Sequence, residues 1–311
     1  MRLVFLGTPA FAVPTLERMV AAGHQVVEAV TQPDRPRGRG RQLAASPVKE
    51  AALRLGIPVY QPERVRRPEA VEHLRALAPE AMVVVGYGQI IPQSVIDLAP
   101  RGIINVHASL LPKYRGAGPI QWAIANGETR TGVTTMRIDA GLDTGEMLLK
   151  AETEIGPEEN AVELGLRLAE MGAGLLVRTL EGLVDGSIVG EKQDNAQATY
   201  APLLKKEDGA IDWSRPAQEI HNRVRGLQPW PGASTTFRGQ PLHVWRSRVA
   251  DAGPGGTPGA VRSVRPLAVQ CGSGALELVE VQMEGRKRVP AGDFANGQRL
   301  TENEVLGETH A

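Results

Sequence analysis

The sequence predicts an α/β domain with a mostly parallel sheet, followed by a smaller β-barrel. Apolar runs of strand length alternate with amphipathic helical segments through the first half of the chain, as in βαβ units. From residue 233 the pattern changes to short alternating runs separated by Gly and Pro, which is typical of small barrels. The length of 311 residues is also enough for two domains.

The amino-terminal half opens with an apolar run at 3–6, and its length and flanks are those of a buried parallel strand. We expect Thr8 to cap the following helix and Gly23 to end it, before a second strand at 26–30. This βαβ beginning implies a right-handed crossover and a Rossmann-like sheet. Further strands are expected at 57–60, 82–85, 102–106, 132–138 and 147–155, and helices at 48–55, 68–77, 119–126 and 161–184. The glycines of the last helix weaken the prediction that it is continuous.

The pattern lapses between residues 186 and 208, where Gly, Asp and Asn indicate a surface linker. We therefore divide the chain into a first domain at 1–185, a linker at 186–208 and a second domain at 209–311. In the second domain we expect one helix at 216–225 and an OB-like barrel of short strands between 233 and 281. Its basic residues, which include Arg286, Lys287 and Arg288, suit nucleic-acid binding, and a solvated barrel face explains them about equally well.

Composition limits the function classes. The formal net charge is +0, so only a local basic patch would attract a polyanion. The single cysteine, Cys271, can form no intramolecular disulfide, and the histidines show no zinc-ligand spacing, so we expect no metal. The amino terminus lacks the character of a signal peptide, and no apolar run is long enough to cross a bilayer. We expect a cytoplasmic protein without membrane association, acting as a monomer.

A polar pair ends the strand at 102–106. Asn105 and His107 are two residues apart, so both side chains leave the strand on one face. Turn residues follow, which places the pair under a loop, and ligands of open α/β sheets bind outside the carboxyl ends of strands. Taken alone, such a pair is more often a satisfied histidine at a strand end than a site.

Two other strand ends carry features that suit ligands. After 26–30, the arginine segment (residues 32–49) places Arg35, Arg37, Arg39 and Arg41 between Pro and Gly, and Lys49 ends it. Such clustered cations suit phosphates, although a solvated basic loop is the simpler interpretation. After 82–85, the glycines in the stretch 86–90 allow close approach to a ring-shaped ligand, or form a tight turn without one.

Two stretches match a known signature in the right order. One is Asn105-Val106-His107-Ala108-Ser109-Leu110-Leu111-Pro112, followed by Arg115-Gly116 and Pro119-Ile120-Gln121; the other is Asp139-Ala140-Gly141-Leu142-Asp143-Thr144-Gly145. Together they resemble the 10-formyltetrahydrofolate-dependent formyltransferases, with Ala108 in place of a frequent glycine. Over nearly the full chain the resemblance is to the branch that formylates an aminoacyl-tRNA, because the arginine segment and the barrel opened by Ile211-Asp212-Trp213 are specific to it.

The resemblance implies a reaction and a set of residues. The reaction is transfer of the formyl group of 10-formyltetrahydrofolate to the α-amino group of methionine on initiator tRNA, without a metal. Asn105, His107 and Asp143 are implied to be catalytic, and Arg41 with its neighbours to enter the acceptor-stem region. The implied folate contacts are Ser109, Leu110, Leu111, Pro112, Gly86, Tyr87, Gly88, Gln89, Ile90, Asp139, Ala140, Gly141 and Leu142.

Formyl transfer to an amine needs an oxyanion stabiliser, a proton acceptor and a proton donor. Asn105 offers an amide donor to the oxyanion. His107 can donate to the same oxyanion and can carry a proton near neutral pH. Asp143 can hold the charge of the imidazole or accept the amine proton through water.

Two alternatives remain open. A formyltransferase acting on a sugar nucleotide or another small amine would keep the three residues, but should not need the arginine segment together with this barrel. A non-catalytic RNA-binding protein would have no reason to keep all three together, and formyl-folates would not stabilise it.

Overall fold

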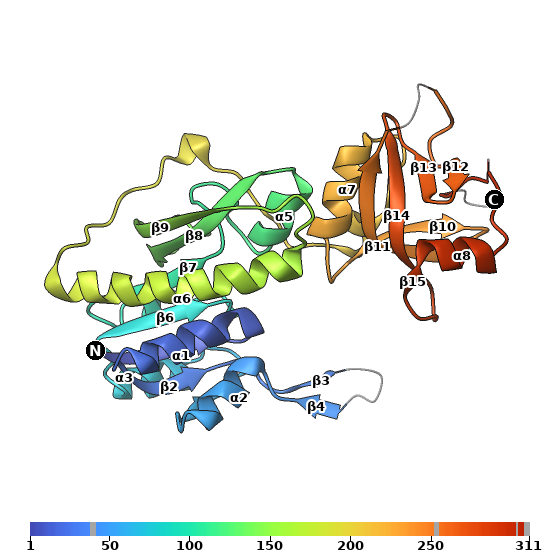
Figure 1. The fold of residues 1–311 in the computed structure, drawn as a ribbon. Coiled ribbons are helices and arrows are strands. Elements are labelled where there is room, and N and C mark those ends of the chain that lie inside the picture. The colour runs from blue at the N-terminus through green and yellow to red at the C-terminus, as the bar shows by residue number, and fades with distance from the viewer. Residues whose placement is uncertain (38–41, 252–254, 303, 308–311) are drawn as a thin grey trace. The chain divides into compact units, whose positions relative to one another are not determined.

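The computed structural model describes residues 1–37, 42–251, 255–302 and 304–307. The chain divides into two compact units, and each unit contains more than one stretch of chain. Met1–Gly116, Arg130–Glu154 and Gly165–Tyr200 form the first unit, and Ala117–Thr129, Ile155–Leu164 and Ala201–Ala311 form the second. Figure 1 labels the helices and strands of both units.

The first unit is built on a seven-stranded sheet with the order β5-β2-β1-β6-β7-β8-β9. Its strands are β1 (Arg2–Gly7), β2 (Gln25–Val30), β5 (Val59–Tyr60), β6 (Ala81–Val85), β7 (Ile103–His107), β8 (Arg130–Arg137) and β9 (Met147–Glu154). The strands from β5 to β7 pair in parallel, whereas β8 and β9 are antiparallel. The loop between β8 and β9 is too short for a parallel crossover, which explains why these two strands are antiparallel to each other. The predicted α/β class with a mostly parallel sheet is confirmed.

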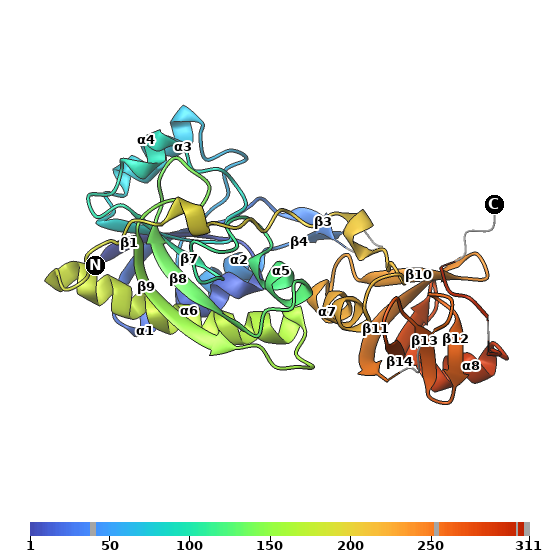
Figure 2. The ribbon, with the colours of Figure 1, turned by 90° about the horizontal axis from the view of Figure 1, so that it is seen from above.

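Helices cover both faces of this sheet. They are α1 (Val13–Ala21), α2 (Pro47–Arg54), α3 (Pro68–Ala76), α4 (Gln93–Ile96) and α6 (Ala161–Asp185). Figure 2 shows α3 and α4 on one side of the sheet and α1 and α6 on the other. On the α3 side, Leu6 and Met82 of the sheet pack with Leu74 and Val95. The central strands β1, β6 and β7 are therefore buried on both faces, as their nearly continuous apolar runs predicted.

The long helix α6 is continuous over 25 residues, contrary to the doubt raised by its glycines. Gly172 allows it to approach the sheet closely, because an added Cβ would lie 2.7 Å from Cγ1 of Val106 and 3.2 Å from Cγ1 of Val133. Gly174, on the same helix, has no such neighbour within 4 Å.

These two glycines give a matched test of that packing. Gly172→Ala is expected to lower the free energy of unfolding by about 1–2 kcal/mol, because overpacking outweighs the gain in helix propensity. Gly174→Ala should raise it by about 0.5–1 kcal/mol, since only the propensity changes. Chemical denaturation measures both. Equal stability of the two variants would show that α6 does not need its close approach to the sheet.

Two local predictions near the start of the chain differ from the structure. Thr8 does not cap a helix: its hydroxyl donates to the carbonyl of Tyr87 at 3.0 Å, and α1 begins only after a 3₁₀ turn at Ala10–Ala12. The arginine segment forms a short antiparallel pair, β3 (Arg35–Arg37) with β4 (Gln42–Ala44), and then reaches α2. Ser46 caps α2, since its Oγ accepts from the backbone nitrogen of Lys49 at 3.1 Å.

The second unit contains an antiparallel sheet with the order β10-β11-β14-β13-β12, and β15 pairs with β14. These strands are β10 (Ala233–Phe237), β11 (Gln240–Ala250), β12 (Val261–Val264), β13 (Leu267–Gln270), β14 (Ala275–Met283) and β15 (Val289–Pro290), and the helices are α5 (Pro119–Ala125), α7 (Ala217–Gly226) and α8 (Ala291–Gly297). Trp213, Ile220, Phe237 and Phe294 lie in one core. The predicted carboxyl-terminal β domain is confirmed, and α8 was not predicted.

Cys271 lies in the core of the second unit, where 1% of it is exposed. Burial raises the pKa of its thiol to about 12, so the thiolate is scarce at neutral pH. The predicted formyl-transfer chemistry assigns no role to this thiol, and its burial agrees with that. Within the described ranges, no helix is both long and apolar enough to span a membrane.

Candidate active site

The carboxyl end of β7 carries Asn105 and His107 on one face, as their spacing predicted. The two residues are 9% and 6% exposed. β7 is held between β6 and β8, so its end is a rigid support. The side-chain amide of Asn105 forms no hydrogen bond with any residue that the structure describes. Its two N–H donors are therefore available to a ligand.

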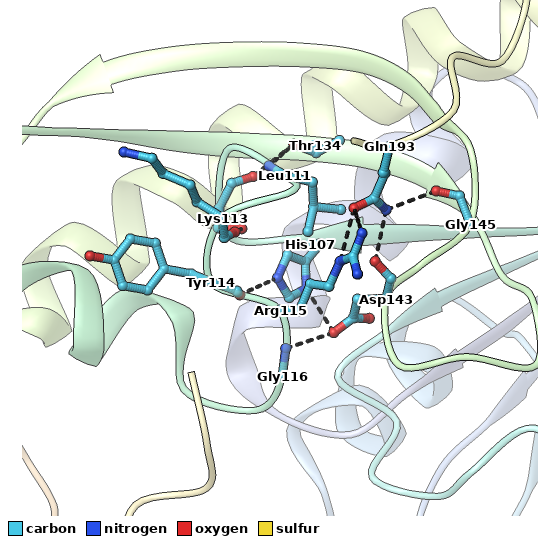
Figure 3. A network of polar contacts seen from close by, with 11 residues as sticks. His107, Leu111, Lys113, Tyr114, Arg115, Gly116, Thr134, Asp143, Gly145 and Gln193 are labelled. Atoms are coloured by element: carbon cyan, nitrogen blue, oxygen red, sulfur yellow. Dashed lines mark hydrogen bonds and ion pairs between the residues drawn. The ribbon is translucent and has the colours of Figure 1, made fainter. Parts of the chain in front are cut away.

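His107 has an oxygen in front of each ring nitrogen (Figure 3). Nε2 lies 2.9 Å from the carbonyl oxygen of Tyr114. Because a carbonyl only accepts, Nε2 must carry a proton. Nδ1 lies 3.7 Å from Oδ2 of Asp143. The proton on Nε2 is therefore committed to the carbonyl of Tyr114, so donation from His107 to an oxyanion would have to come from Nδ1, which at 3.7 Å forms no hydrogen bond with Asp143.

Asp143 reaches His107 from the loop between β8 and β9. Its backbone has φ 51°, a left-handed conformation that is uncommon for a residue with a side chain. The backbone nitrogen of Gly116 donates to its Oδ2 at 2.8 Å. Asp139 stabilises the same loop, because its Oδ1 accepts from the nitrogen of Gly141 at 3.0 Å and from Oγ1 of Thr144 at 2.7 Å. The side chain of Asp139 therefore shapes the loop, which limits its availability for folate.

Gln193 also contacts this loop, and the sequence did not indicate it. It lies in the stretch that was expected to be a linker, which returns to the first unit where Glu191 pairs with Met147. Its Nε2 donates to the carbonyl oxygens of Asp143 and Gly145 at 2.7 and 2.8 Å. A single glutamine in an irregular stretch carries no periodicity or spacing that would have identified it.

In the turn after His107, some of the residues that were predicted to contact folate instead stabilise the turn itself. Oγ of Ser109 donates to the carbonyl of Lys113 at 2.6 Å, and Ser109 is fully buried. Leu111 packs with two methionines of β8 and β9 in a small core. Leu110 and Pro112 are partly exposed, and they are the members of this turn whose side chains can reach a ligand.

In the stretch Gly86 to Ile90, too, some of the predicted folate residues stabilise the protein and others are exposed. Tyr87 is 1% exposed and belongs to the core of the first unit, where burial raises the pKa of its hydroxyl. Oε1 of Gln89 accepts from the backbone of Val65 at 2.7 Å, so this side chain holds a neighbouring loop. The side chain of Tyr87 is therefore out of reach of a ligand, whereas that of Gln89 is partly exposed but engaged by the loop. Ile90 is 92% exposed, and Gly86 and Gly88 have positive φ.

The predicted basic residues lie in two separate places. In the first unit, Lys49 pairs with Asp34 at 2.6 Å and Arg35 with Glu63 at 3.6 Å. The side chain of Arg37 is not described, and Arg39 and Arg41 lie outside the described residues.

In the second unit, Arg286 and Lys287 are exposed between β14 and β15, and the guanidinium of Arg288 lies 3.5 Å from the ring centroid of Trp245. The arrangement of Arg288 on Trp245 is a cation–π contact. Among the described residues, no group of three or more His, Cys, Asp or Glu is placed to hold a metal ion.

Two family models match most of the chain, and curated relatives match nearly all of it. The model described as formyl transferase matches residues 1–180, and the one described as formyl transferase, C-terminal domain, matches residues 203–299. The methionyl-tRNA formyltransferase of Solibacter usitatus is 76% identical over 310 residues and covers 100% of both chains. That of Koribacter versatilis is 58% identical over 310 residues and covers 99% of both.

Solved structures share the fold at low sequence identity. HypX from Aquifex aeolicus in complex with tetrahydrofolic acid has a TM-score of 0.66 and 16% identity, covering 98% of this chain and 48% of that one. An N-formyltransferase from Helicobacter canadensis in complex with folinic acid and dTDP-3-aminofucose has a TM-score of 0.65 and 18% identity, covering 92% and 99%. Together with the full-length relatives, these findings place the chain in the formyltransferase family, in the branch of the methionyl-tRNA formyltransferases.

Proposed function

We propose that the chain transfers the formyl group of 10-formyltetrahydrofolate to the α-amino group of methionine on initiator tRNA. The observation that carries this proposal is the high identity to methionyl-tRNA formyltransferases over the full length of the chain. The free amide of Asn105 beside the His107–Asp143 pair supports it, because this donor and this pair are what acyl transfer to an amine requires.

In the proposed reaction, the α-amino nitrogen attacks the formyl carbon and the bond from that carbon to N10 of the folate breaks. Negative charge develops on the formyl oxygen, and the amide of Asn105 donates to it. The amine loses a proton to the His107–Asp143 pair. Nδ1 is the ring nitrogen that can exchange this proton, because Nε2 donates to the carbonyl of Tyr114. The proton then passes to N10, which leaves as the N–H of tetrahydrofolate.

We propose that folate binds over the loops 86–90 and 139–142. Each loop exposes one large apolar side chain, Ile90 at 92% and Leu142 at 60%. Exposed apolar groups of this size gain free energy when a flat ring covers them. Leu110 and Pro112 are the remaining candidates among the predicted contacts, since the side chains of Ser109 and Leu111 are buried.

We further propose that different parts of the chain have different functions. Residues 1–185 would catalyse, 209–311 would bind tRNA and 186–208 would link them, in a monomer. The arginine segment would contact the acceptor stem. RNA stems are recognised largely through shape and backbone, so exposed cations suffice for such contacts.

The experiment that tests the function measures transfer of radiolabelled formyl from 10-formyltetrahydrofolate to charged initiator Met-tRNA. Uncharged tRNA, free methionine and an amino-sugar nucleotide serve as controls. Label on the charged tRNA alone supports the proposal, whereas transfer to the amino sugar instead overturns it. No transfer to any acceptor, with no thermal stabilisation by a formyl-folate, would favour the non-catalytic alternative.

The tRNA contact has its own prediction. The double substitution Arg286→Ala/Lys287→Ala should raise KM for Met-tRNA without changing KM for folate, because both cations are exposed far along the chain from Asn105. The slope of log KM against log salt should fall by roughly 0.7–0.9 for each lost phosphate contact. Arg215→Ala is the control, since Arg215 already pairs with Asp212 and Glu219. Equal losses for both substrates would contradict the assignment.

A further inference from the structure

A buried arginine supports the Asp143 loop. Arg115 is 2% exposed. Its Nε and Nη2 donate to Oε1 of Gln193 at 3.0 and 2.7 Å (Figure 3). Nη2 also donates to Oδ1 of Asn195 at 2.9 Å. Both acceptors are neutral amides, and no carboxylate in the described part of the chain forms an ion pair with Arg115. Burial of a charge among neutral partners costs free energy, so packing alone does not account for this residue.

Gln193 links Arg115 to the loop that carries Asp143. An arginine can only donate, so the amide oxygen of Gln193 must face Arg115 and the amide nitrogen must face the opposite way. That nitrogen donates to the carbonyl oxygens of Asp143 and Gly145. Asp143 has a positive φ, which costs about 1–3 kcal/mol for a residue with a side chain and persists only where the surroundings hold it. Gln193 binds the carbonyl of this strained residue directly.

The residues on either side of Arg115 form hydrogen bonds with His107 and Asp143. The carbonyl of Tyr114 accepts from Nε2 of His107, and the nitrogen of Gly116 donates to Oδ2 of Asp143. The backbone nitrogen of Arg115 itself donates to the carbonyl of Thr199 at 2.9 Å. Three consecutive residues therefore position the imidazole, the backbone of the aspartate and its carboxylate.

We propose that Arg115 and Gln193 are positioning residues of the formyl-transfer site. Arg115 fixes the orientation of the Gln193 amide, and this amide holds Asp143 in the left-handed conformation that directs its carboxylate towards Nδ1 of His107. Neither residue needs to touch the reacting atoms, because their effect passes through Asp143. This proposal rests on the proposed function for its kinetic consequence, while its structural part concerns the free protein.

Gln193→Glu is the decisive variant. The new carboxylate still accepts from Arg115, but it places an oxygen instead of an N–H against the carbonyls of Asp143 and Gly145. We expect kcat to fall about 10–100-fold with little change in either KM, a loss in the range of coupled hydrogen-bond networks. In an Asp143→Asn background the same substitution should cost less than about threefold, because no carboxylate remains to be positioned. Equal costs in the two backgrounds would overturn the proposal.

Amide hydrogen exchange tests the positioning without any assay of activity. The N–H of Gly116 donates to the Asp143 carboxylate, so its exchange reports whether that carboxylate stays in place. Gln193→Glu is expected to speed this exchange about tenfold or more. Asn195→Ala, which removes one acceptor from Arg115 but leaves Gln193 on Asp143, should change neither the exchange nor kcat. Unchanged exchange in Gln193→Glu refutes the proposal, and absence of formyl transfer by the wild type would refute only the proposed function.

Discussion

Replacing Asn105 by alanine is expected to lower kcat about 10²–10³-fold, which is the usual cost of losing one preorganised donor to an oxyanion. The amide has no partner among the described residues, so its donors are free for the charge that develops on the formyl oxygen. The N–H at Nε2 of His107 is committed to the carbonyl of Tyr114, so it cannot take over this donation. Single-turnover formyl transfer at saturating folate measures the effect directly.

A second substitution at the same position separates donation from packing. Asn105→Asp keeps the size of the side chain but replaces both N–H donors with a carboxylate, so its kcat should be no higher than that of Asn105→Ala. Binding of a formyl-folate should remain measurable in both variants by calorimetry, because the proposed folate contacts lie in other loops. If Asn105→Ala kept kcat within threefold of wild type, Asn105 would not be the oxyanion donor.

His107→Ala is expected to lower kcat about 10²–10⁴-fold, the range typical of a lost general acid–base group. The variant removes the nitrogen that faces Asp143 and the Nε2 donor of the hydrogen bond to the carbonyl of Tyr114. Loss of this buried hydrogen bond should also lower the free energy of unfolding by about 1–3 kcal/mol. Stopped assays of formyl transfer and chemical denaturation measure the two effects separately.

A further variant of His107 separates the expected loss of catalysis from the expected loss of stability. His107→Gln offers an amide N–H to the carbonyl of Tyr114 and should recover part of the stability, but it cannot exchange a proton and should stay as inactive as His107→Ala. His73→Gln is the control on α3, where Nε2 of the histidine lies 2.7 Å from Oε2 of Glu28. It should affect stability alone. Near wild-type turnover by His107→Gln would exclude a role for the imidazole in proton transfer.

Much of the fold could be predicted because its signals are local. Apolar runs of strand length located each strand of the first sheet. The elements that were missed have weak local signals. The helix α4 contains only four residues, and α8 is a seven-residue helix with two glycines. The start of α1 was placed too early because Thr8, a good cap by residue type, instead donates to Tyr87 from another strand end.

The sequence by itself determined the order of most elements, the class of both domains and the pairing of Asn105 with His107 on one face. Each of these follows from short-range periodicity, turn residues or an i, i+2 spacing. The family signature also placed Asp143 in the loop that reaches this pair.

Only the tertiary structure decided how these groups are used. It showed that Nε2 of His107 is occupied by a carbonyl, that Tyr87 is buried in the core, that Gln89 holds a neighbouring loop, and that Gln193 holds Asp143 across 50 residues of chain. Such contacts depend on where the chain brings distant backbone groups together, and each buried donor or acceptor takes whichever partner lies within reach. No residue pattern records that choice, because it is made after the strands and loops have packed.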